Sequence, residues 1–563
     1  MIQRSTPLRT HTSLTFVAVL ALVTQAAAEP RFTVEAKNGV VVSVSEAASN
    51  VGLNILKKGG NAVDASVATA FALAVTYPQA GNIGGGGFMV VHPPNGKPVV
   101  VQYREKAPLK ATPTMFGKGA SSYGHLVVGV PGTVRGMARA HEKFGKLPWK
   151  TVVSPAAKLA KNGFRLDKQV APSLNQILGA AKDFRELRRV YGRPDGRQWN
   201  PGDVLKLPEL AATLDLIANQ GPDAFYKGKI ARQIVAEMKR GRGIISLKDL
   251  ATYTAQVQEP VHGTYRGYDI YGPPPPASGG VCLIEMLNVL KNFDLRKAGR
   301  WSPKTNHILA ETMRRAFYDR ARFLGDPDFV KIPGYLTKQA HARKLAKSID
   351  LHKATTSDSI AKEIKLAREG NSTTHFSVID KDGLAVSNTY TLERSYGARV
   401  VVKGAGFLLN NEMGDFNWYP GYTNRKGRIG TKPNLIAPGK RMLSSQCPII
   451  IAKNGKVRVV TGSPGGRSII NTVLLVTLNL LEFQMSPREA IDASRLHHQW
   501  FPDYILFEGT TKHPKLVAKL AKMGHKIVPN VFQGDAHTIW VEPKTGRYVG
   551  VADKRRSGAA SGY

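Results

Sequence analysis

Two-thirds of the way along its 563 residues, the chain contains the stretch Asn371-Ser372-Thr373-Thr374-His375-Phe376-Ser377-Val378-Ile379-Asp380, in which hydroxyl-bearing residues open a strand-like run. A threonine becomes a strong nucleophile beside a general base, or when it is an N-terminus and its own amine serves as the base. An α-amine has a pKa near ~7.7–8.0, so part of it is neutral at physiological pH. Cleavage before Thr373 would therefore supply a nucleophile and a base in one residue.

A hairpin follows this run. Lys381-Asp382-Gly383 separates it from a second alternating run, residues 385–392, and predicts a tight turn in which Gly383 takes a positive φ. Counting outward from that turn places Thr391 opposite Thr373, and facing side chains have Cβ atoms ~4.5–5.5 Å apart. The Thr391 hydroxyl could then hold the Thr373 Oγ1. On spacing alone, two ordinary β-branched strand residues remain the simpler interpretation.

Three other short segments carry groups suited to catalysis. Thr461-Gly462-Ser463-Pro464-Gly465-Gly466 lies between a predicted strand and a predicted helix, so glycine N–H groups there could bind an oxyanion, although a plain turn explains it as well. Two adjacent hydroxyls, Ser444 and Ser445, follow a basic pair, and the acids Glu412 and Asp415 lie in a loop.

Hydrophobic patterning predicts an α+β fold. The expected helices lie at residues 47–56, 61–76, 281–290, 469–483 and 486–494, and residues 147–238 are mainly helical. The expected strands lie at residues 40–44, 88–92, 98–104, 374–379, 385–392, 449–452, 457–460, 537–541 and 548–551. Residues 338–370 are charged and poor in apolar side chains, so we expect a mobile segment. Strands in the middle with helices on both sides indicate stacked sheets covered by helices.

The N-terminus predicts export. Arg4 and Arg9 precede an apolar run at residues 14–23, and Ala26-Ala27-Ala28 follows it, which is typical of a secretory signal peptide cleaved after Ala28. The apolar run is too short for an uncleaved membrane anchor. We therefore expect a soluble protein that is periplasmic or secreted.

Composition limits the partners. The formal charge is +38, and removing residues 1–28 takes away two arginines and no acid, which leaves +36. This excess should attract anionic surfaces, but the basic clusters are scattered and nucleic-acid binding is not predicted. Cys282 and Cys447 are too few for a disulfide framework, and two buried free thiols are expected rather than a pair.

Taken together, the motifs resemble those of the gamma-glutamyltranspeptidases (glutathione hydrolases), which belong to the N-terminal nucleophile hydrolase superfamily. The resemblance covers nearly everything after the signal peptide and rests on residues 81–88, 103–105, 129–132, 275–280, 373–375, 410–413, 443–445 and 461–466. It implies a four-layer αββα sandwich, in which two stacked antiparallel sheets are covered by helices and are built jointly by two chains. Those chains would come from one precursor.

The resemblance also implies roles for particular residues. The precursor would cleave itself between Ser372 and Thr373, giving a signal peptide at 1–28, a large subunit at 29–372 and a small subunit at 373–563. The implied catalytic residues are Thr373 as nucleophile, Thr391 as its support, and Gly465 and Gly466 as the oxyanion hole.

The implied substrates are glutathione and other γ-glutamyl compounds, with water or an amino-acid or dipeptide acceptor resolving the acyl-enzyme, and with no cofactor or metal. Their carboxylate would bind Arg104, Ser444 and Ser445. Their ammonium would bind Glu393, Glu412 and Asp415.

The chain departs from the family pattern at two positions. Glu393 stands where several members carry Asn, and Gly414 replaces a common Asp. Residues 417–440 resemble the family's lid loop, in which Trp418, Tyr419 and Tyr422 are candidate covers. His497 and His498 have no third metal ligand at suitable spacing, so we interpret them as structural.

Two other functions remain open from the sequence. A cephalosporin or glutaryl acylase of the same superfamily shares the nucleophile, but its substrate lacks the ammonium that the acids at 412 and 415 favour. A catalytically inactive basic protein that adheres to anionic surfaces would not need Thr373, Thr391 and the glycine turn together.

Overall fold

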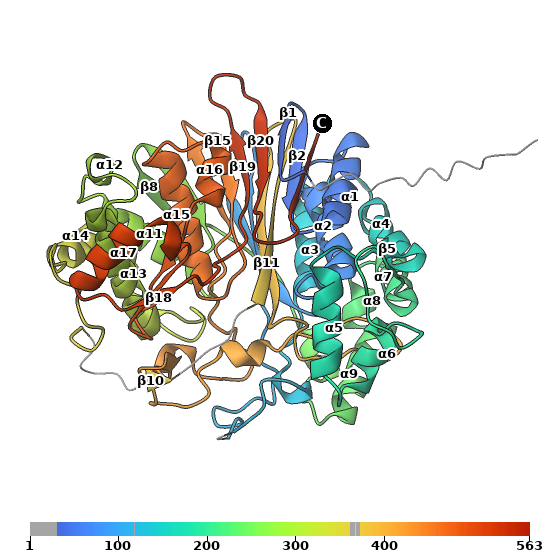
Figure 1. Cartoon of the computed structure of the whole chain (residues 1–563). Helices are drawn as coiled ribbons and strands as arrows, with labels where there is room; N and C mark the ends of the chain where they lie inside the picture. The colour runs from blue at the N-terminus through green and yellow to red at the C-terminus, as the bar shows by residue number, and fades with distance from the viewer. Residues whose placement is uncertain (1–30, 118, 361–365, 368–371) are drawn as a thin grey trace, which may run out of the picture.

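The computed structural model describes residues 31–117, 119–360, 366–367 and 372–563 (Figure 1). The expected signal peptide lies outside the described residues. Within the described ranges, no helix is long and apolar enough to cross a membrane. Two seven-stranded sheets lie face to face at the centre of the molecule, and helices lie outside each of them (Figure 1).

The first sheet has the predicted hairpin at its centre, and all its strand pairs are antiparallel. Its order is β21 (Ala559–Gly562), β2 (Gly39–Ser43), β11 (Ser372–Asp380), β12 (Ala385–Glu393), β3 (Gly86–His92), β4 (Val99–Tyr103) and β7 (Gln256–Gln258). Every residue of β12 is buried. A central strand covered on both faces explains why its sequence carries few charges.

The second sheet is antiparallel as well. Its order is β1 (Thr33–Ala36), β20 (Tyr548–Ala552), β19 (His537–Val541), β15 (Lys456–Thr461), β14 (Ile449–Lys453), β9 (Tyr268–Gly272) and β8 (Val261–Tyr265). Apolar side chains from both sheets, among them Val42, Phe88, Ile379, Ile450 and Ile539, form one buried cluster between them. Side chains alternate along a strand, so the opposite faces need a second cover.

Helices supply that cover on both sides. Those beside the first sheet are α1 (Glu46–Lys57), α2 (Ala62–Thr76), α3 (Thr133–Phe144), α4 (Trp149–Asn162), α5 (Val170–Ala180), α6 (Arg185–Tyr191), α7 (Pro208–Gln220), α8 (Asp223–Tyr226), α9 (Lys229–Arg240) and α10 (Leu247–Ala251). Those beside the second are α11 (Gly279–Leu290), α12 (Leu295–Ala298), α13 (Pro303–Phe323), α14 (Gln339–Lys347), α15 (Ser468–Leu481), α16 (Pro487–Asp492) and α17 (Pro514–Lys522). The expected four-layer α+β arrangement is confirmed.

Shorter elements connect these layers. Small sheets are formed by β5 (Phe164–Arg165) with β6 (Val204–Leu205), by β10 (Leu366–Ala367) with β13 (Arg428–Ile429), and by β16 (Leu496–His497), β17 (Ile505–Phe507) and β18 (Ile527–Pro529). The 3-10 helices are η1 (His125–Val127), η2 (Gly334–Thr337), η3 (Glu412–Asp415), η4 (Lys432–Asn434) and η5 (Thr510–Lys512).

Local sequence explains where α2 begins. The Asn61 side chain accepts hydrogen bonds from the N–H groups of Val63 and Asp64, and the Asp64 carboxylate accepts one from the Asn61 N–H at 3.0 Å. This capping box satisfies N–H groups that a helix start leaves unpaired. Every residue of α2 is buried, which explains why the helix is apolar on all sides.

The β11–β12 hairpin has the predicted turn and register. Gly383 has a φ of +85°, and the Asp380 N–H donates to the Leu384 carbonyl at 3.2 Å. The predicted pairing holds from Thr374 opposite Tyr390 to the turn, and a bulge interrupts it between Ser372 and Thr374.

The prediction was incomplete or wrong in several places, and it contained none of α3, α13, α17, β1 and β7. The start of the segment expected to be mobile forms α14, whose buried residues are only Ala342 and Ala346, so its apolar signal is weak. Strand β21 consists of small residues without β-branched side chains, and β8 and β9 are short and only partly buried. Such strands depend on their neighbours rather than on their own propensity.

The cysteine expectation is confirmed. Cys282 and Cys447 are both buried free thiols. Burial raises the pKa of each thiol above its ordinary value, so neither is a reactive thiolate at neutral pH.

Candidate active site

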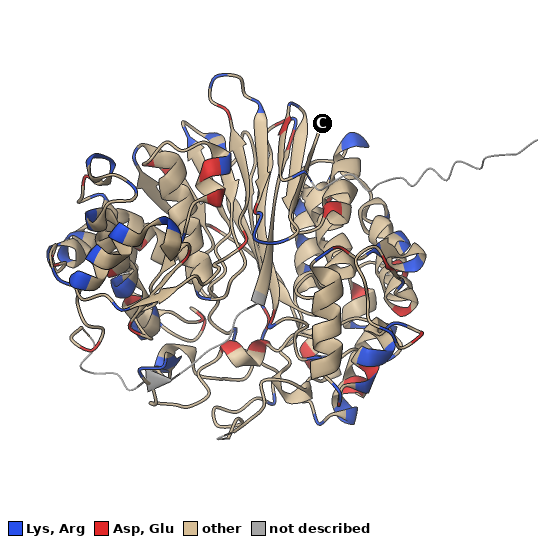
Figure 2. Cartoon of the chain, viewed as in Figure 1, with Lys and Arg blue, Asp and Glu red and all other residues tan. Residues whose placement is uncertain are grey.

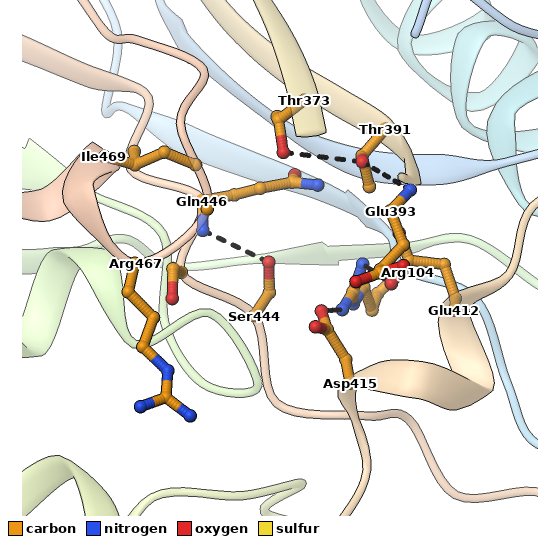
Figure 3. Close-up of a pocket in the computed structure, with 12 residues that line it drawn as sticks. Arg104, Thr373, Thr391, Glu393, Glu412, Asp415, Ser444, Gln446, Arg467 and Ile469 are labelled. Carbon is orange, nitrogen blue, oxygen red and sulfur yellow. Dashed lines mark hydrogen bonds and ion pairs between the residues drawn. The ribbon is translucent and has the colours of Figure 1, made fainter. Parts of the chain in front are cut away.

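The hairpin places two threonine hydroxyls in contact. Thr373 lies at the start of β11 and Thr391 near the end of β12, and both are buried. Thr373 Oγ1 donates a hydrogen bond to Thr391 Oγ1 at 3.4 Å, and Thr391 Oγ1 accepts one from the Glu393 N–H at 2.7 Å (Figure 3). The contact predicted from spacing is therefore present, although Thr373 itself lies in the bulge. Of Ser372, only the backbone in β11 is described.

His375 lies where the hairpin packs against the turn after β15 of the second sheet. Its Nδ1 is 2.8 Å from Thr389 Oγ1 and its Nε2 is 3.1 Å from Ser377 Oγ. Burial lowers the pKa of His375 well below its ordinary value, so the ring is neutral. A Cβ at Gly462 would lie 2.4 Å from this ring, so the glycine permits the two sheets to approach beside Thr373.

The glycine-rich turn reaches the same site. Gly465 has a φ of +135° and Gly466 a φ of +57°, which are conformations that L side chains rarely adopt. The turn precedes α15, so its N–H groups lie at the positive end of the helix dipole. Gly466 lines one pocket with Thr373, whereas Gly465 does not and instead accepts hydrogen bonds from Ser468 through its carbonyl.

Arg104 follows β4 and is surrounded by acids. Its Nη1 lies 3.2 Å from Glu105 Oε2 and 2.7 Å from Glu412 Oε2, and its Nη2 lies 2.5 Å from Asp415 Oδ2. It also donates to the carbonyls of Met442 and Leu443. Burial opposes its charge, but these carboxylates outweigh burial and raise the pKa of Arg104.

The acids outnumber the arginine. Burial raises the pKa of both Glu105 and Glu412 above the ordinary value, although Arg104 acts in the opposite direction. Glu393 lines the same pocket, has a φ of +76°, and accepts a hydrogen bond from the side chain of Asn411. Three carboxylates contact the Arg104 guanidinium, and Glu393, which also pairs with Arg394 at 3.4 Å, brings a fourth acid to the pocket, so the site would attract a cation.

Ser444 and Ser445 also line the pocket, and Figure 3 shows Ser444 beside Arg104. Ser444 Oγ accepts a hydrogen bond from the Gln446 N–H at 3.1 Å, and its backbone carbonyl accepts one from Ser278 Oγ at 2.6 Å. Ser445 Oγ accepts one from Arg320 Nη2 at 3.0 Å. The Ser445 hydroxyl is therefore held by a side chain of α13, whereas Ser444 is held through its backbone carbonyl by Ser278, the residue that precedes α11.

Of the predicted site residues whose side chains are described, all but Gly465 line this pocket. The lining residues are Arg104, Thr373, Thr391, Glu393, Glu412, Asp415, Ser444, Ser445, Gln446, Gly466, Arg467 and Ile469. Sequence reasoning missed Gln446, Arg467 and Ile469, although each directly follows or lies close to a predicted motif. Gln446 is buried, its side-chain amide has no hydrogen-bond partner, and Figure 3 shows it extending toward Thr373.

The candidate lid aromatics lie beside the site rather than in it. Trp418 stacks on Phe116 with ring centroids 4.1 Å apart and donates its Nε1–H to the Met413 carbonyl at 2.6 Å. Tyr419 and Tyr422 line a separate groove with Trp418. None of the three lines the pocket that contains Thr373. Trp418 instead stabilises η3, the 3-10 helix that contains Glu412 and Asp415, through its hydrogen bond to Met413.

His497 and His498 have protein partners, as a structural role requires. His497 is hydrogen-bonded to Asn471 and Gln499, and His498 lies 3.3 Å from Asp503. Burial lowers the pKa of both rings to about 4, so both are neutral at physiological pH.

Comparison with known proteins gives a consistent result. The family model described as Gamma-glutamyltranspeptidase matches residues 48–563. The chain is 44% identical over 530 residues to a glutathione hydrolase proenzyme of Escherichia coli, with 93% of this chain and 91% of that protein covered. A cephalosporin acylase structure from Bacillus halodurans is similar with a TM-score of 0.84 at 27% identity, covering 97% of this chain and 99% of that one. A gamma-glutamyltranspeptidase structure from Helicobacter pylori has a TM-score of 0.54 at 41% identity, covering 55% of this chain and 91% of that one.

Proposed function

The chain belongs to the gamma-glutamyltranspeptidase family, and from that premise we propose that it is a self-processing γ-glutamyltransferase and glutathione hydrolase whose nucleophile is Thr373. The observation that carries the residue assignment is the pocket in which the Thr373–Thr391 hydroxyl pair faces an arginine and an excess of acids.

Processing begins at the Ser372–Thr373 peptide bond. Thr373 Oγ1 attacks the Ser372 carbonyl carbon, the C–N bond breaks, and the nitrogen takes up a proton as the new α-amine. Water then hydrolyses the resulting ester, which leaves a carboxylate on Ser372 and a free hydroxyl on Thr373. The relatives' name, proenzyme, supports such a step. The products would be the chains 29–372 and 373–563 once residues 1–28 have been removed.

Turnover uses the same hydroxyl with its new base. The Thr373 amine accepts the proton as Oγ1 attacks the γ-carbonyl of the substrate, and Thr391 orients Oγ1 through their hydrogen bond. The turn at Gly465 and Gly466 would stabilise the oxyanion through backbone N–H groups. The leaving amine takes the proton, and water or an acceptor amine resolves the γ-glutamyl ester.

Substrate selection depends on both charges of the glutamyl head. Because Arg104 contacts Asp415, a substrate zwitterion would insert between them. The substrate carboxylate would bind the Arg104 guanidinium and the hydroxyls of Ser444 and Ser445. The substrate ammonium would bind the carboxylates of Asp415, Glu412 and Glu393. A glutaryl group lacks the ammonium and would leave that acid excess uncompensated.

Replacing Thr373 by Ala tests the assignment. We expect an uncut chain on denaturing electrophoresis and no release of chromophore from a γ-glutamyl anilide, whereas the wild type gives two chains, the smaller beginning at Thr373. Thr374→Ala is the matched control and should still be cut. Cleavage that persists in Thr373→Ala would show that the nucleophile is misassigned.

The same assay separates the acylase alternative, which the structural likeness to a cephalosporin acylase keeps open. We expect γ-glutamyl anilide to be turned over much faster than glutaryl anilide. A preference for glutaryl anilide would establish the acylase activity, and no turnover of either by cut wild-type protein would favour the inactive surface-binding protein.

Export and surface contact complete the proposal. Residues 1–28 would direct export to the periplasm or the outside of the cell. The large positive charge would favour electrostatic contact with anionic surfaces there. That contact should weaken as the salt concentration rises.

A further inference from the structure

Helices α11, α13 and α14 bring together three side chains that the proposed reaction does not use: Glu285, Asp319 and His341. Figure 1 shows these helices together on the outer side of the second sheet, and they contact one another. One ligand atom from each residue lies within 4.8 Å of the other two. His341 Nε2 is 2.8 Å from Asp319 Oδ2 and 3.8 Å from Glu285 Oε1.

Both carboxylates of this cluster are buried. Glu285 is 1% exposed, and its Oε1 accepts no hydrogen bond. Asp319 is 3% exposed. A buried carboxylate oxygen without a hydrogen bond is costly, and the cationic contact that this oxygen makes, with His341 Nε2 at 3.8 Å, is long, so the oxygen points to a closer cationic partner.

The surrounding basic groups do not meet this need. Arg322 Nη1 lies 3.8 Å from Asp319 Oδ1 and its side chain is 36% exposed. Arg320 directs its guanidinium to the hydroxyls of Ser278 and Ser445. His341 can carry one positive charge and is the remaining cation that contacts both acids.

We propose that Glu285, Asp319 and His341 bind a divalent transition-metal ion, Zn²⁺ or Mn²⁺, that ties α11, α13 and α14 together. Zn²⁺ accepts imidazole nitrogen and carboxylate oxygen at about 2.0–2.2 Å, and Mn²⁺ favours carboxylate oxygen. Tetrahedral ligands at that distance lie about 3.4 Å apart, and the observed separations of 2.8 and 3.8 Å bracket this value. The His341 side chain is 17% exposed, which gives an ion a route inward.

A second group, His307, Glu311 and His525, also places ligand atoms within 4.8 Å of one another. His307 Nδ1 is 2.8 Å from His525 Nε2, and His525 Nδ1 is the one imidazole nitrogen of this group without a hydrogen-bond partner. Glu311 is neutralised by Arg315 at 2.6 Å and Arg314 at 3.3 Å. A bound cation would compensate less negative charge there, so we assign the metal ion to Glu285, Asp319 and His341.

An ion at Asp319 would also act on the pocket wall. The next residue, Arg320, donates to Ser445 Oγ, and Ser445 lines the pocket with Thr373. The metal would thus fix the turn of α13 that supports this serine.

The test uses the processed full protein, stripped with EDTA and titrated calorimetrically with ZnCl₂ or MnCl₂. We expect one ion per processed molecule and a higher Tm when it is bound. Glu285→Gln and His341→Gln should each weaken binding roughly tenfold or more. His262→Gln is the matched control, because His262 contacts a single carboxylate, Asp269, at 2.9 Å, and it should bind as the wild type does.

Anomalous diffraction from Zn²⁺-soaked wild-type crystals gives a readout that does not depend on the variants. We expect a peak between the three helices. Absence of stoichiometric binding, unchanged binding in both variants, or a peak beside His307 and His525 instead would overturn the proposal. In those cases a protonated His341 shared by two acids explains the cluster.

Discussion

Arg104 lies fully buried in contact with the carboxylates of Glu105, Glu412 and Asp415. Pairing one guanidinium with several acids is costly in a buried site unless further cations arrive. A substrate ammonium is such a cation, so the excess acid favours a zwitterionic ligand over a simple carboxylate. The motifs identified these residues individually, but the Arg104–Asp415 contact depends on how η3 packs against the loop after β4, which the sequence does not display.

Gln446 leads to a prediction at the same scale. Its buried amide has no hydrogen-bond partner and faces the pocket. We expect Gln446→Leu to raise KM for a γ-glutamyl anilide roughly 3- to 10-fold, because a bound substrate would lose a hydrogen bond. The Tm should stay equal or rise, since an unpartnered buried polar group is removed.

Gln533→Leu is the matched control for this experiment. The Gln533 side chain is buried and donates to the carbonyls of Arg495 and Leu506, so its loss should lower the Tm and leave KM unchanged. A lower Tm with unchanged KM in Gln446→Leu would instead assign Gln446 a purely structural role.

At the scale of elements, the contact between β11 and the end of β15 sets the position of the site. Gly462 follows β15 and leaves room for His375, whose ring spans the gap between the sheets. We expect Gly462→Ala to destabilise the protein by about 1–3 kcal/mol, because its Cβ would overlap the ring and push the sheets apart. Differential scanning calorimetry would show a lower Tm, and electrophoresis would show slower processing.

Gly179→Ala is the control for that experiment. Gly179 lies in α5, with no atom within 4 Å of an added Cβ, so alanine should be neutral or stabilise by roughly 0.5–1 kcal/mol. A Gly462→Ala protein as stable and as fully processed as the wild type would show that the sheets are not in tight contact at this point.

Elements with strong local signals were predictable, and those defined by their neighbours were not. The β11–β12 hairpin follows from alternation and Gly383, and α2 follows from its capping box and apolar content. By contrast, β21 has no apolar β-branched residue and forms only because β2 offers an open edge. The bulge at Thr373 was also missed, since a one-residue register change leaves no mark in the sequence.

At the scale of the whole molecule, positive charge is widely distributed. Figure 2 shows Lys and Arg over the helices at both ends of the molecule rather than on one face. We expect such a distribution to favour weak contact with extended anionic surfaces over contact through a single face.

The two predicted chains should remain one particle after cleavage, because each sheet contains strands from both sides of the proposed cut. In the first sheet, β11 and β12 of the small chain pair with β2 and β3 of the large one. In the second, β20 pairs with β1 and β14 pairs with β9. Both sheets therefore depend on both chains. We expect the cut wild type to elute in size-exclusion chromatography at the volume of uncut Thr373→Ala, with both chains in one peak and separation only in denaturant. A small chain that elutes alone in native buffer would contradict this shared core.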